Sequence, residues 1–185
     1  VTSPTNCGSG GRGVSAGNSE GGSGGGAMML VVANETVVHG GIHADWSWAG
    51  PYAGSGGSIF LITGKLSGDG KINAGSPGNS PVSTGGGGRI ALILTNSTVW
   101  GDVVLSAASR NASGSGYAGA AGTIYVETPD QGAGGGTLLI DAEGVVASPL
   151  STTLINDKVT DTVVGDLIIT NSARLKIAAR QSLTV

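Results

Sequence analysis

The feature that most constrains this chain is a unit that recurs about every 30 residues. Each unit begins with a glycine run, continues with a short apolar segment, turns through polar residues and ends in a second short segment that closes on alanine. The residues Ile59, Ile90 and Ile124 are separated by 31 and 34 positions, and Ile42 and Ile72 by 30 positions. Such a period is typical of solenoids, in which neighbouring units stack to bury a shared apolar face.

The apolar segments predict β-strands rather than helices. They are four to seven residues long, rich in Ile, Val and Leu, and bounded by Gly, Asn, Ser and Pro, which is the pattern of strands. After Gly144 the glycine runs end, but strand patterns continue at 163–169 and 175–177. The expected first strands of the four units are 28–32, 58–62, 89–94 and 122–126, and the expected second strands are 42–45, 71–74, 105–108 and 138–142.

We therefore expect an all-β fold, a β-solenoid in which the glycine runs form loops at one corner of each coil. Ala44, Ala74, Ala107 and Ala142 are expected to occupy one equivalent place in each coil and to stack along the axis. Two alternatives stay open. Glycine runs also build bundles of polyproline II helices, which can mix with strands, and an immunoglobulin-like sandwich is a weaker option.

Composition divides the chain into three parts. Residues 1–19 form a glycine- and serine-rich N-terminal segment, and residues 20–144 carry the glycine-rich repeats of about 30–35 residues. Residues 145–185 continue the coils without glycine runs. Because strand patterning persists to the last residues, we expect further chain or a partner to complete the final coils.

The overall composition excludes several classes of protein. Glycine accounts for 36 of the 185 residues, and charged residues make up only 11%. With 9 Lys and Arg against 12 Asp and Glu, we expect no basic surface for nucleic acid. No apolar run approaches the roughly 18 residues that a membrane-spanning helix needs. The hydrophobic share of 39% and the net charge of −3 exclude disorder driven by charge.

Glycine placement and strand spacing together carry a resemblance to a known kind of protein. They resemble the glycine-rich repeats of very large secreted or surface proteins of bacteria and protists, which look like right-handed parallel β-helices of the pectin-lyase-like kind. The resemblance covers about residues 20–185. It implies a right-handed β-helix located outside the cell, and it implies no particular activity. The segments that carry it are 54–61, 66–74, 85–92, 120–126 and 136–142.

No arrangement of catalytic residues is recognisable. Pectin-lyase-like enzymes, which this chain resembles in its repeats, typically use clustered acidic residues, often with calcium. No two of the 12 acidic residues here are adjacent. His39, His43 and Asp45 would share one face of a strand, but Gly40 and Gly41 interrupt it. Surface histidines are therefore expected rather than a metal site. We predict no enzymatic activity, no cofactor and no metal.

An aromatic segment stands out against the small residues around it. Trp46, Trp48 and Tyr52 place three of the seven aromatic residues close together, where the other units carry Gly, Ser and Asn. Exposed aromatic rings could stack on sugar rings or contact a neighbouring subunit. The other interpretation is a loop folded over the flank of the solenoid, and both stay open.

Two kinds of covalent modification are also candidates. Asn34, Asn96 and Asn111 begin Asn-x-Ser/Thr sequons and are candidate N-glycosylation sites in a secreted protein. Cys7 is the only cysteine, so no internal disulfide can form, and it is a candidate for an intermolecular disulfide.

These patterns lead us to expect a non-catalytic structural protein of the cell exterior. It would be a β-solenoid segment of a surface stalk, fibre or coat that self-associates, because an uncapped solenoid end offers free strand edges. The alternative is a carbohydrate-binding or adhesive module that uses Trp46, Trp48 and Tyr52 on cell-surface or matrix glycans.

Overall fold

The computed structural model describes residues 2–13, 21–45, 52–76, 83–110, 117–146 and 149–185. Over these residues the chain is all-β and forms a β-solenoid of about four turns, as the repeats predict. The strands are β1 (Ala27–Val37), β2 (Gly41–His43), β3 (Ser58–Ser67), β4 (Lys71–Asn73), β5 (Arg89–Leu94), β6 (Val104–Ser106), β7 (Thr123–Glu127), β8 (Thr137–Asp141), β9 (Thr153–Ile155), β10 (Asp166–Thr170) and β11 (Leu175–Ile177).

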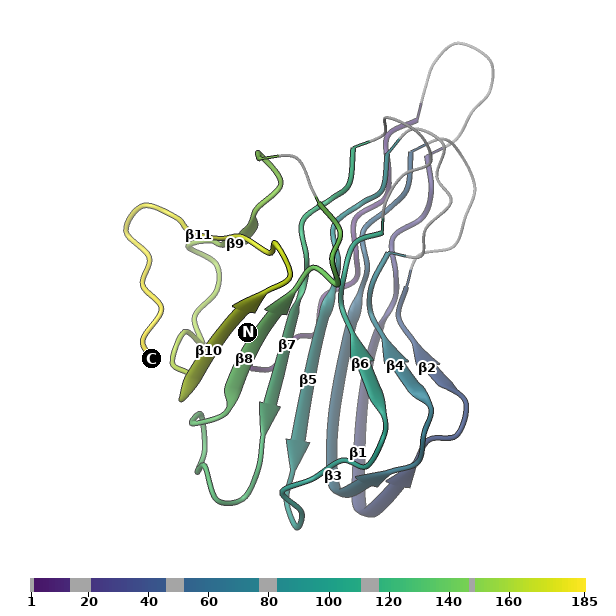
Figure 1. Ribbon diagram of the computed structural model, residues 1–185, viewed down its shortest axis with the longest axis vertical. Coiled ribbons are helices and arrows are strands. Elements are labelled where there is room, and N and C mark those ends of the chain that lie inside the picture. Colours follow the sequence, from purple (N-terminus) through teal and green to yellow (C-terminus); the bar gives the residue numbers. More distant parts are fainter. Residues whose placement is uncertain (1, 14–20, 46–51, 77–82, 111–116, 147–148) are drawn as a thin grey trace.

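Six strands form one long sheet in the order β1-β3-β5-β7-β8-β10 (Figure 1). The first four are parallel, because each coil returns the chain to the sheet in the same direction. The register places Ile59 opposite Ile90 and Ile90 opposite Ile124. This is the register that the spacing of these isoleucines predicts.

A short sheet, β2-β4-β6, closes the first three coils, with Ile42, Ile72 and Leu105 in register. The main core lies between the short sheet and the long sheet. Ile59, Ile72 and Leu92 belong to this core and are at most 1% exposed. Burying a side chain of this size stabilises the fold by about 1.5–3 kcal/mol, so stacking the coils creates the core that one coil alone lacks.

The glycine runs form a layer of extended segments that hydrogen-bond to one another, instead of loops at a corner. The N–H groups of Gly22 and Gly25 donate to the carbonyl oxygens of Tyr52 and Ser55. One such bond at every third residue matches the three-residue turn of polyproline II segments. The solenoid thus combines strands with the glycine-segment packing that was the first alternative. The same spacing recurs from Ala53 and Gly56 to Ser83 and Gly86, and from Thr84 and Gly87 to Tyr117 and Ala120.

The glycine layer meets the short sheet at a corner that small residues occupy. The carbonyl oxygens of Ala74 and Ala107 accept hydrogen bonds from the N–H groups of Gly88 and Gly122 and so join each coil to the next. A Cβ atom on Gly87 would overlap the Ala107 carbonyl group. Glycine is required here by the close approach of two backbones. Three of the predicted alanines stack at this corner: Ala44, Ala74 and Ala107.

The fourth unit departs from the repeat. After β7 the chain turns back through residues 128–136, where Gly132 and Gly134 adopt φ angles of 73° and 78°, and β8 pairs antiparallel with β7. Glycine tolerates these left-handed angles, which permit a tight reversal. The prediction that residues 138–142 form a further short strand equivalent to β6 is therefore wrong, and Ala142 lies in a different cluster.

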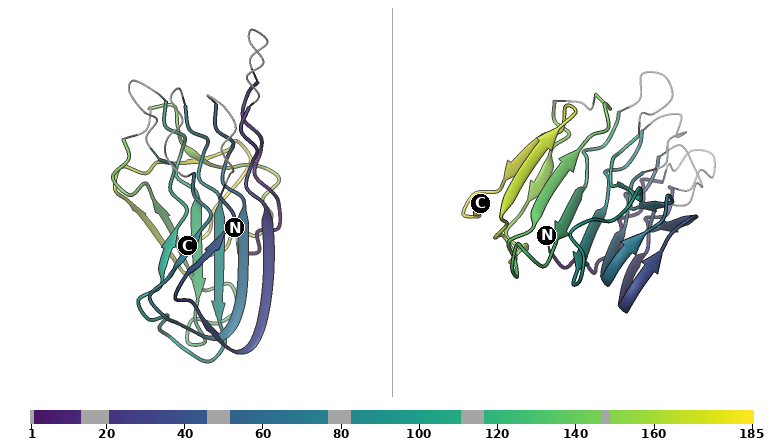
Figure 2. Two further views of the ribbon diagram at one scale, coloured as in Figure 1. Left: turned by 90° about the vertical axis from the view of Figure 1, so that its right-hand side faces the viewer. Right: turned by 60° about the horizontal axis from the view of Figure 1, so that its bottom comes forward.

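The strands β8 to β11 build a smaller stack of coils. In this stack β8 and β10 belong to the long sheet, and β9 and β11 lie on the face of that sheet opposite the main core. β8 pairs with β10 and β9 with β11, both in parallel. Leu139 packs against the main core, whereas its neighbour Ile140 belongs to a cluster with Ala142 and Leu175. Consecutive side chains of a strand point to opposite faces, so β8 serves both stacks. Figure 2 (right) shows the yellow C-terminal strands at the end of the molecule away from the first coil.

An N-terminal strap, residues 2–13, runs along the outside of the coils. The N–H and hydroxyl groups of Thr2 donate to Asp161 Oδ2 at 2.6 and 2.7 Å. Further along, the Gly8 N–H group donates to the Gly25 carbonyl oxygen. The strap therefore connects the C-terminal stack to the glycine layer of the first coil.

Candidate functional site

The aromatic segment that the sequence singles out is described only at Tyr52, because Trp46 and Trp48 lie outside the described residues. Tyr52 is half-buried and lies in the glycine layer between the segments of Gly22 and Ser83. Its carbonyl oxygen accepts the Gly22 N–H group, and its backbone forms a parallel bridge with Ser83. Tyr52 is thus part of the hydrogen-bonded layer.

The two histidines have different partners. His39 Nδ1 lies 2.7 Å from Asp69 Oδ1 in the next coil, and this hydrogen bond lowers the pKa of Asp69. His43 Nδ1 lies 3.1 Å from Asp45 Oδ2, which also accepts the Asn73 amide at 2.8 Å. Within the described ranges, no group of three His, Cys, Asp or Glu side chains is placed to hold a metal ion.

The candidate modification sites lie mainly on the surface. Asn34 is exposed in β1, beside a bulge where the register with β3 shifts. Asn96 is exposed directly after β5, and Asn111 lies outside the described residues. Cys7 is an exposed free thiol in the N-terminal strap.

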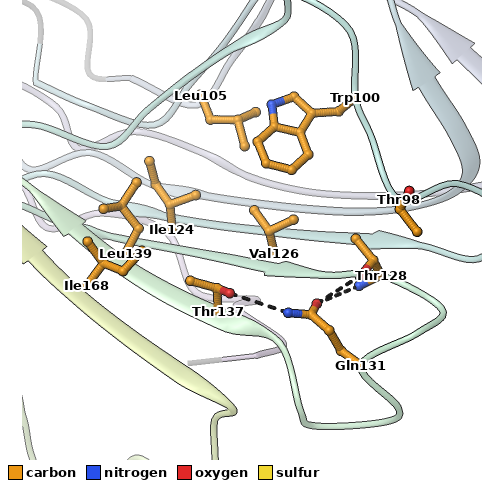
Figure 3. Close-up of a pocket in the computed structure, with 10 residues that line it drawn as sticks. All are labelled: Thr98, Trp100, Leu105, Ile124, Val126, Thr128, Gln131, Thr137, Leu139 and Ile168. Carbon is orange, nitrogen blue, oxygen red and sulfur yellow. Dashed lines mark hydrogen bonds between the residues drawn. The ribbon is translucent and has the colours of Figure 1, made fainter.

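An apolar groove of about 480 Å³ opens beside β6, where the short sheet stops (Figure 3). Ile124 of β7, Leu139 of β8 and Ile168 of β10 form its floor, and Trp100 and Leu105 form the facing wall. This face of the long sheet is uncovered because the chain reverses after β7 and adds no further short strand. The groove is thus a direct result of the departure from the repeat.

One end of the groove is polar. Gln131 Oε1 accepts the Thr128 N–H group at 3.0 Å, and Gln131 Nε2 lies 3.4 Å from Thr137 Oγ1 (Figure 3). None of the ten residues that line the groove has an ionisable side chain. The groove therefore offers apolar contact and a few hydrogen bonds, and its lining contains no general acid or base.

Tyr125 fixes the reversal that leaves the groove open. Its side chain is fully buried, and its hydroxyl donates to Glu127 Oε2 at 2.6 Å and accepts the Gly136 N–H group at 2.9 Å. Burial, followed by the hydrogen bond to Glu127, raises the pKa of Tyr125 to about 12. The neutral phenol therefore stabilises the hairpin between β7 and β8.

The first coil leaves a second surface uncovered. β1 and β2 are both edge strands of their sheets. Leu30 and Ile42 are only half-buried, whereas Leu61 and Ile72, at the equivalent places in the next coil, are 1% and 0% exposed. The difference shows what a further coil would bury at this end.

The backbone of β1 also has unused hydrogen-bonding groups at this end. The Ser58 N–H group donates to the Gly26 carbonyl oxygen, so even-numbered residues at the start of β1 bond towards β3. Because bonding direction alternates along a strand, the N–H groups of Met29 and Val31 point to the open edge. Their side chains are 57% and 66% exposed. We call β1 and β2 with these exposed groups the open coil end.

Sequence reasoning did not find the groove. Trp100, Leu105 and Ile168 are far apart in the sequence, and no motif connects them. The available signal was the segment 128–136, whose proline and glycines indicate a chain reversal. Once the reversal is recognised, an uncovered sheet face beside β6 follows.

Comparison with known proteins adds no family to this description. No family model matches the chain, and neither a curated protein nor a solved structure does. In the part of the chain that the structure describes, no helix has the length and apolar character to cross a membrane. Its function must therefore be argued from its own surfaces.

Proposed function

We propose that the chain is a non-catalytic structural module of the cell exterior that pairs with a second copy of itself through the open coil end. The single observation that carries this proposal is the incomplete burial of Leu30 and Ile42, compared with the complete burial of their equivalents in the next coil. A further pair of strands beside β1 and β2 would cover both side chains. Exposed edge strands are the usual places where another chain adds to a sheet.

A partner that covers the open coil end must present two strand edges separated by the width of one coil. The open coil end itself has this geometry. At the other end, β10 and β11 are also edge strands, but β11 lies on the opposite face of the long sheet from the short sheet, so these two edges do not continue the coils of β1 and β2. The matching surface is therefore the open coil end of a second copy, and a two-fold axis would relate the two copies.

Charge does not oppose this contact. Glu35 is the only charged residue of β1, and its carboxylate is already paired with Lys65 at 3.0 Å. Apolar side chains of β1, Met29 and Val31 among them, are free to pack across the interface. Such burial is the main favourable term in most protein association.

Two observations support a location outside the cell. The sequon at Asn96 lies on an exposed turn, where an oligosaccharide can be attached. The glycine-rich repeats also resemble those of secreted and surface proteins, and this likeness supports the same location. Detection of a glycan at Asn96 in material from the natural source would test the proposal directly.

Proline substitution in β1 tests the pairing. In Val31→Pro the edge N–H group is lost, but no hydrogen bond to β3 is lost, because this group points away from the sheet. We expect the purified chain to sediment as a dimer and Val31→Pro as a monomer. The matched control Val31→Thr keeps the N–H group and the β-branched shape, and it should still dimerise. A monomeric parent chain, or dimers in all three proteins, would contradict the proposal.

A further inference from the structure

A second candidate site begins with three residues in register at the start of neighbouring strands. Ser58 of β3, Arg89 of β5 and Thr123 of β7 lie side by side in the long sheet. The residue that follows each of them is an isoleucine of the main core. Because side chains alternate along a strand, this row points to the opposite, outer face of the sheet.

The guanidinium group of Arg89 is incompletely satisfied. Its Nε and Nη2 atoms donate to Ser58 Oγ at 3.0 and 2.9 Å, and Nη2 also donates to the Asn6 carbonyl oxygen at 2.8 Å. The two N–H groups of Nη1 make no hydrogen bond to the described residues, and no described carboxylate forms an ion pair with Arg89. Partial burial lowers the pKa of Arg89, which shows that the charge has lost some hydration.

Thr123, next to Arg89 in the row, has an unused polar atom. The residue is 6% exposed, and its Oγ1 atom is buried without a hydrogen-bond partner among the described residues. Buried hydroxyl groups are nearly always hydrogen-bonded, because an unpaired one is destabilising. The Thr123 hydroxyl is therefore a donor that lacks an acceptor.

Arg89 and Thr123 line one cleft of about 260 Å³, between the glycine layer and residues 152–156. Arg89 also lines an adjoining cleft of about 350 Å³, between the N-terminal strap and residues 158–161. The second cleft includes the side chain of Lys158, which is exposed and has no ion pair with a described residue.

One acidic residue faces the second cleft. Asp161 Oδ2 accepts hydrogen bonds from the N–H and hydroxyl groups of Thr2 and from the Ser3 N–H group. The strap therefore satisfies this carboxylate, which forms no ion pair with Arg89. Together, Arg89 and Lys158 leave an excess of positive charge around the two clefts.

From this geometry we infer that Arg89 and Thr123 form a binding site for an oxyanion, a sulfate or carboxylate group carried by a free ion or by an acidic sugar. The two Nη1 N–H donors match two oxygen atoms of such a group. Thr123 lies beside Arg89 and lines the same cleft, so its hydroxyl is a further donor for such a group, and Lys158 adds charge at the rim of the adjoining cleft. This site goes beyond the proposed pairing and does not depend on it, since it lies on the outer face of β5 and β7.

Calorimetric titration of the full chain at constant ionic strength tests the site, with inorganic sulfate and a sulfated hexasaccharide as separate probes. We expect saturable binding that falls by about tenfold or more in Arg89→Gln, because a charge-assisted hydrogen bond is lost. Thr123→Val keeps the shape of the side chain and should weaken binding by about threefold or more for the same reason. Lys176→Ala removes an exposed positive charge on β11 and is the matched control, with binding unchanged.

The two probes distinguish the sources of the anion. Tighter binding of the hexasaccharide through the same two residues would identify an acidic sugar, and equal binding would identify a free anion. The inference is wrong if neither probe binds, or if Arg89→Gln and Lys176→Ala reduce binding equally. Thr123→Val keeps the test decisive if Arg89→Gln fails to fold.

Discussion

At the corner where the glycine layer meets the short sheet, the coils can approach closely because glycine has no Cβ atom. The neighbouring glycines Gly86 and Gly87 illustrate how specific this requirement is. A Cβ atom on Gly87 would overlap the Ala107 carbonyl group, whereas one on Gly86 would lie 3.6 Å from the Ala120 oxygen, an ordinary contact. Two adjacent glycines of one run therefore have opposite tolerance to substitution.

This difference gives a prediction at the scale of one residue. Gly87→Ala should lower the free energy of unfolding by about 3 kcal/mol, because the added methyl group forces two backbones apart. Gly86→Ala should leave it unchanged or raise it by about 0.5 kcal/mol, because alanine reduces the freedom of the unfolded chain. Denaturant titration of the two variants measures both values. Equal losses would show that the layer lacks the close contacts described here.

Tyr125 gives a second prediction at this scale, concerning pH. Its pKa is raised from 10.0 to about 12, so the neutral phenol contributes stability that is fully present below pH 10 and is lost as the pH rises through about 12. Tyr125→Phe cannot ionise and should show a flatter fall in stability between these pH values. The midpoint of thermal unfolding, measured across this range for both proteins, checks the expectation. Parallel curves would contradict it.

At the scale of the element, β1 differs from the strands behind it. Its edge groups, the N–H groups of Met29 and Val31, should exchange with solvent quickly in dilute solution. The N–H groups of Leu30 and Val32 point towards β3 and should exchange slowly. Pairing through the open coil end would slow the exchange of Met29 and Val31 as the protein concentration rises. Hydrogen exchange followed residue by residue measures this, and fast exchange at every concentration would count against pairing.

A glycan would act on the same element. Asn34 is exposed in β1 beside its bulge, so an attached oligosaccharide would stand next to the open edge. We expect protein glycosylated at Asn34 to stay monomeric and Asn34→Gln, produced in the same cells, to dimerise. Sedimentation of the two forms decides this, and dimerisation of both would show that the contact lies elsewhere.

Elements that follow the repeat could be predicted from the sequence, and those that depart from it could not. The spacing of Ile59, Ile90 and Ile124 predicts the observed register, because successive coils of similar length place equivalent residues opposite one another. The glycine layer was foreseen only as the alternative to corner loops, although the pairs Gly54 and Gly57, and Gly85 and Gly88, show its three-residue spacing. Strand patterns indicate β8 but leave its direction open, since alternation is the same in either direction.

The candidate sites were harder to predict than the strands. Arg89 and Thr123 begin strands whose spacing already places them in one row, so their proximity could be anticipated. Their unsatisfied donors could not, because these depend on where the N-terminal strap and residues 152–161 pack. Those contacts join segments that no repeat relates, and a single sequence contains no periodic signal for them.

At the scale of the whole molecule, β8 connects two cores. Leu139 packs against the main core, and Ile140 belongs to the cluster of the C-terminal stack. If either stack unfolded, β8 would be displaced and the core of the other stack would be exposed. The division at residues 144 and 145 that composition indicates therefore does not imply independent folding.

Calorimetry tests this coupling. The full chain should unfold in one transition, with equal calorimetric and van't Hoff enthalpies. Ile140→Ala, at a fully buried position, should lower the free energy of unfolding by about 3 kcal/mol and shift the entire transition. Two separate transitions, only one of them sensitive to Ile140→Ala, would show that the stacks are independent.

The reversal after β7 has a consequence for how large an assembly can become. In a solenoid of identical coils the two ends are complementary, so copies can add head to tail without limit. Here β8 and β10 run against β1, β3, β5 and β7, so the end that carries β10 and β11 does not continue the coils of β1 and β2 in the same direction. Under the proposed pairing, a molecule with one open coil end forms a closed pair that has no surface of this kind left, and assembly would then terminate at two copies.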